Sequence, residues 1–322
     1  MFSYHHKPDW HIADSEATPE SKFMDRRSFI KTMGIGALTL GTFQNCQAQS
    51  ATINTMLPPL PDYTKNAAYK DAGRAITEEK LVTSYNNFYE FGFSKSDPAT
   101  NAKNFSLDPY TLTIDGHCDN PMKVDLEQIE KLGLEERVYR FRCVEAWAMT
   151  VPWIGVPLSK LIEQAQPNSK AKYVAFTCFY DPKRAKGQND KRYDWPYYEG
   201  LRLDEAMNEL TMITTGYYGK RLLPQSGTPL RIITPWKYGY KGPKSIVKMT
   251  FTDVEPKTYW NTAIPGEYKF YSNVDPEVPH PRWSQAREQF LGERLKNKPT
   301  ELYNGYGKQV AKMYADRKRD LY

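Results

Sequence analysis

A cysteine that follows two arginines is the residue whose type and setting best suit metal chemistry. Cys143 ends the run Arg140-Phe141-Arg142-Cys143. In a strand, Arg140 and Arg142 would share one face and Phe141 and Cys143 the other. Nearby guanidinium groups favour a thiolate, which is a nucleophile or a soft metal ligand, whereas composition alone favours a buried structural cysteine. Glu145 would share the face of Cys143 if the strand continues, and there it would tune protonation or pair with one of the arginines.

The remaining cysteines and histidines form no recognised metal motif. The other cysteines are Cys46, Cys118 and Cys178, and the sequence contains no CxxC pair. This excludes a zinc ribbon, a thioredoxin-type site and a c-type haem. Beyond the first 50 residues, His117 and His280 are the histidines that remain, which argues against a histidine-rich metal site.

Five sequence blocks, in order, resemble one enzyme family. They are 85–91 (YNNFYEF), 142–147 (RCVEAW), 151–155 (VPWIG), 235–242 (PWKYGYKG) and 280–286 (HPRWSQA). Together they resemble the catalytic subunits of periplasmic protein-methionine-sulfoxide reductases, the MsrP family of the sulfite-oxidase fold. The resemblance covers essentially all of residues 80–310, and several blocks in the right order are more specific than any single motif.

The resemblance implies a molybdenum–molybdopterin cofactor without an attached nucleotide. Its metal would be bound by the pterin dithiolene and by one protein thiolate, which falls on Cys143. The residues implied to hold the pterin are Asn86, Tyr89, Glu90, Arg231, Gly242, Pro243 and Lys244. Their chemistry agrees, because a glycine lets the backbone approach a phosphate and Lys and Arg neutralise it. The alternative for Lys237, Lys241, Lys244 and Lys248 is a solvated basic face.

Two positions depart from the family pattern. A threonine expected in the strand after the ligand cysteine falls on Cys178, with Thr177 just before it, and an asparagine expected before Arg231 falls on Ser226. Both replacements are small and can form hydrogen bonds, although a cysteine does so weakly. We expect the cofactor to be kept, with Cys178 and Ser226 among the residues that hold it. Cys178 is either an oxidation-prone thiol near the pterin or a small core residue.

The elements that must position these residues mix strands and short helices without a βαβ repeat. Strands are predicted at 110–114, 138–143, 173–179, 230–234 and 246–251, after an extended lead-in over 51–80. Helices are predicted at 126–132, 157–165, 203–210 and 282–291. This pattern favours an α+β fold, and the resemblance implies a mixed-sheet, sulfite-oxidase-type molybdopterin-binding domain.

The N-terminal region has the features of a signal peptide. Arg26 and Arg27 form a twin-arginine motif before a charge-free apolar stretch over 33–43, which is too short to span a bilayer. We therefore expect residues 1–50 to be a twin-arginine signal peptide and residues 51–322 to form a single domain in the periplasm. This route exports folded proteins, often with a cofactor already inserted.

Composition excludes several classes of protein. The 322 residues are 40% hydrophobic and 25% charged, as in globular proteins, and a mean hydropathy of −0.70 excludes a polytopic membrane protein. The net charge of +6 is mild, and acidic residues are interspersed with basic ones, so nucleic-acid binding is not indicated.

Three functions are compatible with these observations. The first is an exported molybdenum oxidoreductase that removes oxygen from methionine sulfoxide in oxidised proteins. The sequence contains no haem, flavin or iron–sulfur motif, and the resemblance implies a haem-containing membrane subunit, MsrQ, as electron donor. The second is a sulfite oxidase, although residues 256–322 are too few for the immunoglobulin-like domain that such enzymes usually add. The third is a binding protein without catalytic activity.

An excess of aromatic residues predicts a shallow site that accepts methionine sulfoxide in many sequence contexts. Rings favour contacts with sulfur and demand no particular neighbour. The candidate residues are Trp147, Trp153, Trp236, Tyr238 and Tyr240. At least half of them are expected in the core.

Overall fold

The structure is a computed structural model that describes residues 57–294 and 298–315. The predicted signal peptide over 1–50 lies outside them, so its interpretation stays a prediction.

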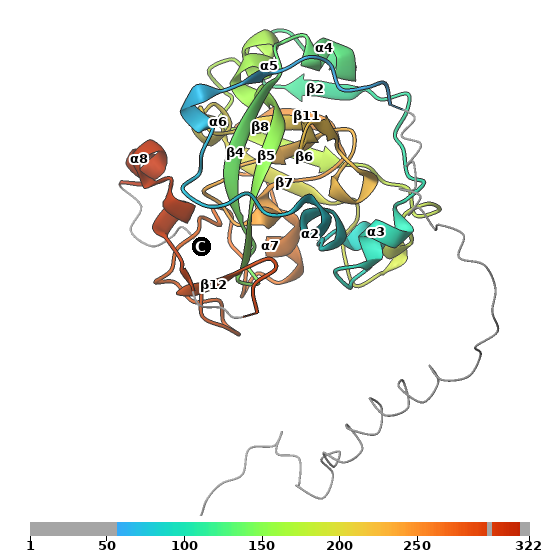
Figure 1. Cartoon of the computed structure of the whole chain (residues 1–322). Coiled ribbons are helices and arrows are strands. Elements are labelled where there is room, and N and C mark those ends of the chain that lie inside the picture. The colour runs from blue at the N-terminus through green and yellow to red at the C-terminus, as the bar shows by residue number, and fades with distance from the viewer. Residues whose placement is uncertain (1–56, 295–297, 316–322) are drawn as a thin grey trace, which may run out of the picture. The chain divides into compact units, whose positions relative to one another are not determined.

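The larger of two sheets carries the strands on which the site is built. Its order is β1-β4-β5-β12-β13, and β8 pairs with β5, β9 and β10. The strands are β1 (Thr64–Lys65), β4 (Glu135–Arg142), β5 (Trp147–Pro157), β8 (Met212–Tyr217), β9 (Lys220–Arg221), β10 (Arg231–Ile233), β12 (Arg287–Phe290) and β13 (Lys298–Pro299). Figure 1 shows the antiparallel strands β4 and β5 running from helix α5 at one end to β12 at the other.

The smaller sheet is mixed in direction. Its order is β3 (Met122–Val124), β2 (Leu112–Gly116), β11 (Ile246–Thr252), β6 (Tyr173–Cys178) and β7 (Tyr198–Arg202). Strand β11 pairs in parallel with β2 and antiparallel with β6. The larger sheet is also mixed, because β12 runs parallel to β5. The predicted α+β class with mixed sheets is confirmed.

The helices are short. They are α2 (Glu79–Ser84), α3 (Asp97–Asn101), α4 (Leu126–Glu130), α5 (Leu158–Ala165), α6 (Leu203–Ala206), α7 (Tyr259–Ala263) and α8 (Gly307–Val310). Turns of 3-10 helix are η1 (Ala67–Tyr69), η2 (Tyr89–Phe91), η3 (Lys186–Asn189), η4 (Pro224–Ser226), η5 (Gly239–Lys241), η6 (Leu302–Gly305) and η7 (Ala311–Tyr314). Helix α4 begins at a capping box formed by Asp125 and Gln128, and α5 ends at Gln166 in the left-handed region.

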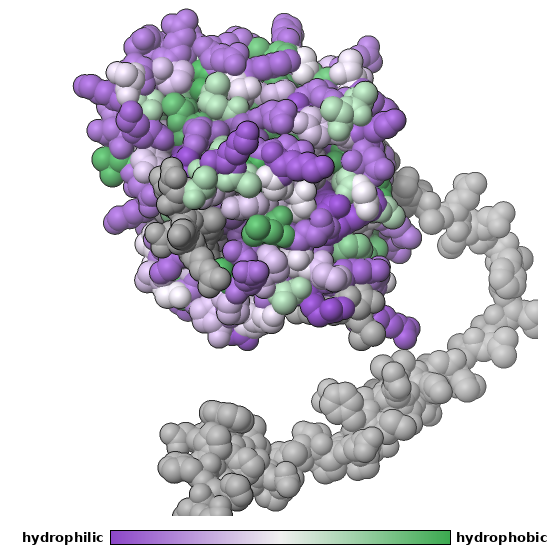
Figure 2. Space-filling model, turned by 90° about the vertical axis from the view of Figure 1, so that its left-hand side faces the viewer, coloured by the Kyte–Doolittle hydropathy of each residue, from purple (hydrophilic) through white to green (hydrophobic). Residues whose placement is uncertain are grey.

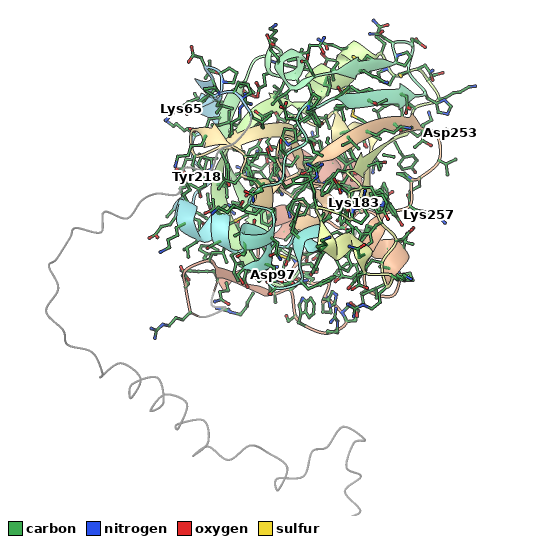
Figure 3. All side chains as sticks on the ribbon, turned by 90° about the vertical axis from the view of Figure 1, so that its right-hand side faces the viewer. Lys65, Asp97, Lys183, Tyr218, Asp253 and Lys257 are labelled. Carbon is green, nitrogen blue, oxygen red and sulfur yellow. The ribbon has the colours of Figure 1, made fainter. Side chains whose placement is uncertain are left out.

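Two large apolar clusters lie on the strands of the larger sheet. Every residue of β5 before Pro157 is buried, which explains a strand that is apolar on both faces. Ile154 and Val156 contribute to the cluster shared with the smaller sheet, whereas Trp153 contributes to the other cluster. Figure 3 shows side chains filling the space between the strands, while exposed residues such as Asp253 and Lys257 project outward.

The helix predicted over 282–291 is wrong. Residues 287–290 form strand β12, in which Gln289 and Phe290 pair in parallel with Trp147 and Ala148. Arg287 is exposed, Glu288 is buried, and the next two residues are partly buried. Pairing with the start of β5 has overridden a sequence whose local pattern suits a helix.

Hydrophilic residues predominate on the face of the molecule that Figure 2 shows. On the face shown in Figure 2, hydrophobic residues occur in small separated groups among hydrophilic ones. Within residues 57–294 and 298–315, no helix combines the length and apolar character needed to cross a bilayer.

Candidate active site

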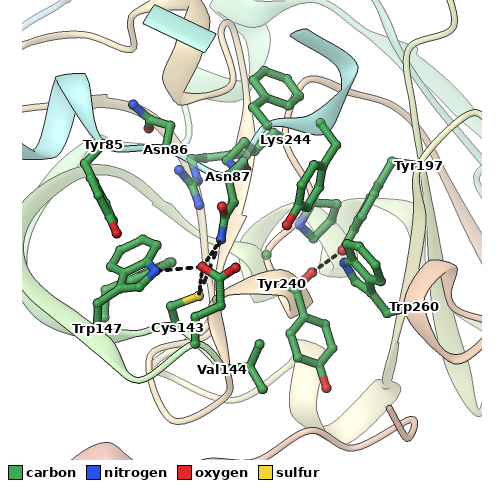
Figure 4. A pocket seen from close by; sticks show the side chains of 18 of the residues that line it. Tyr85, Asn86, Asn87, Cys143, Val144, Trp147, Tyr197, Tyr240, Lys244 and Trp260 are labelled. Atoms are coloured by element: carbon green, nitrogen blue, oxygen red, sulfur yellow. Dashed lines mark hydrogen bonds between the residues drawn. The ribbon is translucent and has the colours of Figure 1, made fainter. Parts of the chain in front are cut away.

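A cavity of about 840 Å³, its open mouth included, contains Cys143 in its wall. Figure 4 shows Cys143, Asn87 and Trp147 on one side of it and Tyr240 and Trp260 on another. The residues that line it are Tyr85–Glu90, Phe141, Cys143, Val144, Glu145, Trp147, Met149, Tyr197, Arg231, Gly239, Tyr240, Gly242, Pro243, Lys244, Trp260 and Tyr268.

Cys143 lies in the tight turn between β4 and β5. Its N–H donates to the carbonyl of Trp147 at 2.9 Å, and the N–H of Ala146 donates to the Cys143 carbonyl at 3.0 Å. The predicted strand thus ends at Arg142, one residue before the cysteine. Side chains in a turn do not alternate between the two faces of a strand. The thiol of Cys143 can therefore point into the cavity beside the side chain of Glu145.

The carboxylate of Glu145 is the polar group next to the thiol. Its Oε2 lies 3.7 Å from Cys143 Sγ and accepts hydrogen bonds from Asn87 Nδ2 and Trp147 Nε1, both at 2.9 Å. Lys95 Nζ lies 2.6 Å from the same oxygen. The salt-bridge partner of Glu145 is therefore Lys95, and neither of the two arginines considered from the sequence.

These contacts keep Glu145 ionised. Burial acts to raise its pKa, but the hydrogen bonds from Asn87, Lys95 and Trp147 outweigh it, so the pKa lies below its usual value. Asn87 also donates from Nδ2 to Cys143 Sγ at 3.6 Å. Asn87 thus bridges the thiol and the carboxylate, a role that the sequence reasoning missed although the residue stands in the YNNFYEF block.

The charge of Arg142 acts to lower the pKa of Cys143, as the sequence predicts, but larger effects outweigh it. Burial, followed by the charge of Glu145, raises the pKa of Cys143 to about 12. Arg142 forms an ion pair with Glu288 at 2.9 Å, and Arg140 forms one with Glu301 at 2.6 Å, so both guanidinium groups are already engaged. A coordinated metal ion would supply the positive charge that the thiolate needs.

Two cations line the cavity away from the thiol. Arg231 is 3% exposed, and burial lowers its pKa to about 10. Its NH1 donates to the Ser226 carbonyl at 3.0 Å, while among the described residues its buried Nε has no hydrogen-bond partner. Burial, and then the charge of Arg231, lowers the pKa of Lys244 to about 7. Desolvated cations with an unused donor fit an anionic group such as a phosphate.

Gly242 and Pro243 form the wall beside these cations. A Cβ atom at Gly242 would lie 2.5 Å from the Ile232 carbonyl oxygen, so a larger residue would force the wall to move. Arg231 and Lys244 are brought together by an isolated antiparallel bridge between their backbones. The strand and the loop named by the sequence therefore meet at one place, as a phosphate cradle requires.

The YNNFYEF block supplies the opposite wall. Asn86, Tyr89 and Glu90 all line the cavity. Asn86 Nδ2 donates to the Thr83 carbonyl at 3.1 Å. Glu90 is buried, which raises its pKa to about 7 against the opposing charge of Lys244. Burial also raises the pKa of Tyr89 well above its usual value, so its hydroxyl stays protonated and available as a donor.

The two departures from the family pattern lie outside the cavity wall. In the part of the chain that the structure describes, the wall includes neither Cys178 nor Ser226. Cys178 is a buried residue at the end of β6, and the hydroxyl of Ser226 is 2.9 Å from that of Tyr217. Ser226 still contacts the site through its carbonyl, which accepts from Arg231.

The aromatic candidates divide between the cavity and the core. Trp147 and Tyr240 line the cavity. Trp153, Trp236 and Tyr238 are buried in the apolar cluster beside it. The other aromatic residues of the cavity wall are Tyr85, Phe88, Tyr89, Phe141, Tyr197, Trp260 and Tyr268.

The lysines of the PWKYG region do not form a solvated basic face. Lys237 and Lys241 are buried in ion pairs with Glu205 and Glu199, each at 2.6 Å. Lys248 is partly exposed and pairs with Asp115 at 2.9 Å.

Comparison with known proteins identifies the family. The oxidoreductase molybdopterin binding domain matches residues 99–260, about half of the chain. A solved structure, the sulfane dehydrogenase SoxCD from Paracoccus pantotrophus, is similar at 16% identity and a TM-score of 0.42 over 60% of this chain. The chain spans about half the length of that protein, 48%. The cation cradle and the cavity thiol fit a molybdopterin with its metal, and this chain belongs to the molybdopterin-binding oxidoreductases of the sulfite oxidase type.

Proposed function

We propose that this chain is an exported molybdenum oxidoreductase that reduces methionine sulfoxide residues in oxidised proteins, with Cys143 as the protein ligand of the metal. The observation that carries the proposal is the position of the Cys143 thiol in an aromatic-lined cavity that also contains Arg231 and Lys244. One cofactor can place its phosphate at the cations and its metal at the thiol. The resemblance of the sequence blocks to the MsrP family supports the substrate.

The bound cofactor would supply the exchange of two electrons, and the chain would hold and orient the reactants. Arg231, Lys244 and the backbone at Gly242 and Pro243 would hold the phosphate, with Asn86, Tyr89 and Glu90 along the pterin. Sulfoxide reduction consumes two electrons and two protons and yields a thioether and water. Glu145 Oε2, 3.7 Å from the ligand sulfur, is the group best placed to pass those protons.

Lys95 and Trp147 support this role of Glu145. Lys95 Nζ contacts both carboxylate oxygens, at 2.8 and 2.6 Å, and the side chains of Lys95 and Glu145 are 26% and 30% exposed, so the ion pair itself reaches solvent. The indole N–H of Trp147 fixes the carboxylate from another direction. Glu145 is thus a candidate catalytic residue, and Lys95 is a positioning residue for it.

The aromatic wall supports a sulfur-containing substrate. Tyr85 and Trp147 pack edge to face at 5.2 Å between ring centres, and Trp260 lies 5.3 Å from Tyr268. A sulfur–ring contact contributes about 0.3–1.5 kcal/mol and does not depend on neighbouring residues of the substrate. Such a wall suits a substrate whose sequence context varies.

The cellular setting completes the proposal. The twin-arginine motif supports export to the periplasm with the cofactor inserted. Electrons would come from a haem-containing membrane subunit of the MsrQ type, as the family resemblance implies.

Activity assays on the purified, molybdenum-loaded protein test the proposal. With a reduced viologen dye as donor, we expect reduction of sulfoxide residues in an oxidised, unfolded protein, and loss of this activity in Cys143→Ser with the fold retained. Full activity in Cys143→Ser would refute the ligand assignment. Reduction of free methionine sulfoxide alone would indicate a small-molecule sulfoxide reductase, and oxidation of sulfite without sulfoxide reduction would indicate a sulfite oxidase.

A further inference from the structure

The turn that carries Cys143, residues 143–146, is held from outside by residues far along the chain. Its carbonyl at Val144 accepts two hydrogen bonds, from Trp283 Nε1 and from Gln285 Nε2, each at 2.8 Å. Gln285 is fully buried. Two side-chain donors on one turn carbonyl restrict the rotation of the peptide that follows the cysteine.

Strand β12 holds the end of the same turn. The N–H of Gln289 donates to the Ala146 carbonyl at 2.9 Å, and the N–H of Leu291 donates to the Ala148 carbonyl at 2.9 Å. Ala146 has φ of +67°, in the left-handed region that residues other than glycine rarely adopt. Such a conformation persists where the surroundings fix it, and here β12 supplies the fixing contact.

A buried ion-pair network holds the beginning of the turn. Arg142 and Glu288 are both fully buried, and Arg142 Nε donates to Glu288 Oε2 at 2.9 Å. Glu288 Oε1 forms a second ion pair, with the guanidinium group of Arg74 at 2.6 Å. Arg142 NH1 donates to the Cys143 carbonyl, and NH2 donates to Gln285 Oε1 at 2.9 Å. The cysteine backbone is thus connected through Arg142 to Glu288 and Gln285.

We propose that residues 283–289, here named the 283–289 brace, position the metal-ligand cysteine. The brace donates to the carbonyls of residues 144 and 146 from Trp283, Gln285 and Gln289. It reaches the carbonyl of residue 143 indirectly, because Glu288 and Gln285 hold Arg142, which donates to that carbonyl. It lies outside the matched molybdopterin-binding domain, which ends at residue 260. The segment after that domain is therefore part of the machinery that sets the place of the ligand sulfur.

The physical reason lies in where the turn stands. Cys143 is the first residue beyond β4, and residues 143–145 line a cavity whose contents change when cofactor is inserted. Residues that orient metal ligands commonly affect metal affinity by 10–100-fold when they are replaced. The brace acts on the backbone of the ligand, whereas Asn87 and Glu145 act on its side chain.

The inference rests on the proposed assignment of Cys143, and holoenzyme variants test both. In Gln285→Ala and in Glu288→Gln, we expect the amides of residues 143–147 to exchange hydrogen at least tenfold faster than in the parent. We also expect Cys143 to become alkylated by iodoacetamide at least tenfold faster as molybdenum is lost. Gln285→Ala removes one neutral side chain, so it serves if Glu288→Gln fails to fold.

Glu130→Gln is the matched control. Glu130 is a buried carboxylate paired with a buried arginine, Arg221, with no contact to the turn among the described residues. We expect it to lower the melting temperature without changing exchange over 143–147 or alkylation of Cys143. Equal effects of all three variants on exchange and alkylation would overturn the brace and leave a purely structural role.

A separate variant distinguishes failure of the brace from failure of the ligand assignment. Cys143→Ser should remove one metal–sulfur contact from the X-ray absorption spectrum of the holoenzyme. An unchanged spectrum in Cys143→Ser would refute the ligand assignment. A lost contact in Cys143→Ser, together with unchanged exchange and alkylation in Gln285→Ala and Glu288→Gln, would refute the brace alone.

Discussion

Replacing Arg231 with Met should have opposite effects on the fold and on the cofactor. Burial lowers the pKa of this arginine from 12.5 to about 10. One pKa unit corresponds to about 1.4 kcal/mol, so the charge on the buried side chain destabilises the cofactor-free fold by about 3 kcal/mol. The sign follows because, at neutral pH, the group is charged both in the folded and in the unfolded chain, and burial disfavours the charged form in the folded chain alone.

Two contacts of Arg231 offset part of this cost. The hydrogen bond to the Ser226 carbonyl contributes about 1 kcal/mol, and the guanidinium lies 4.9 Å from the centre of the Trp153 ring, which contributes about 0.5–2 kcal/mol. Arg231→Met, which keeps an apolar chain of similar length, should therefore leave the cofactor-free fold equally stable or stabilise it by about 1 kcal/mol. In the holoenzyme, loss of a charge-assisted contact of about 1.5–3 kcal/mol should weaken cofactor retention by about 10–100-fold.

Two measurements test this prediction. Urea unfolding of protein purified from cells that make no molybdopterin gives the stability of the cofactor-free fold. The molybdenum content of protein purified from cells that make molybdopterin gives the retention of the cofactor. Arg221→Met is the matched control, because this buried arginine has its donors satisfied by Glu130, Pro58 and Pro59. It should lose about 3–5 kcal/mol of stability. If Arg231→Met lost more than about 2 kcal/mol in the cofactor-free protein, or kept full molybdenum content, the reasoning would be refuted.

Two further predictions concern other buried charges. Lys237→Met should lower the free energy of unfolding by about 3–5 kcal/mol, because the buried carboxylate of Glu205 loses the ammonium group that lies 2.6 Å from it. In urea unfolding, the double variant Lys237→Met/Glu205→Gln should recover most of this loss. Glu90 has a folded-state pKa of about 7, above its unfolded 4.5, so the folded chain binds more protons between these values and the stability of cofactor-free protein should fall as pH rises from about 4.5 to 7. Glu90→Gln should remove this fall in unfolding experiments across that range, and an identical pH profile in both proteins would contradict the assignment.

The sequence alone pointed to a molybdopterin oxidoreductase, because five of its blocks resemble one family in the same order. Cys143, the YNNFYEF block and the PWKYGYKG loop were singled out from their order in the chain, and the structure places residues of all three in one cavity wall. The strands predicted over 173–179 and 246–251 are confirmed as β6 and β11, since their β-branched and aromatic residues form buried faces.

What tertiary structure alone decided is how each charge is used. The sequence places Arg140 and Arg142 beside the cysteine, but it contains no sign that Glu301 and Glu288, about 150 residues later, take both guanidinium groups. Burial then reverses the expected direction of the Cys143 pKa. Desolvation depends on everything that packs around a group, and local sequence does not encode it.

The same reason explains why the segment over 282–291 was assigned to the wrong element. Its residues tolerate a helix locally, and the competing strand gains stability from pairing with Trp147 and Ala148 and from burying Glu288 against Arg142. These partners lie about 140 residues away in the chain, where no local pattern reports them. The sequence singled out the candidate residues, and the packing of distant segments decided where Cys143 stands and what holds it there.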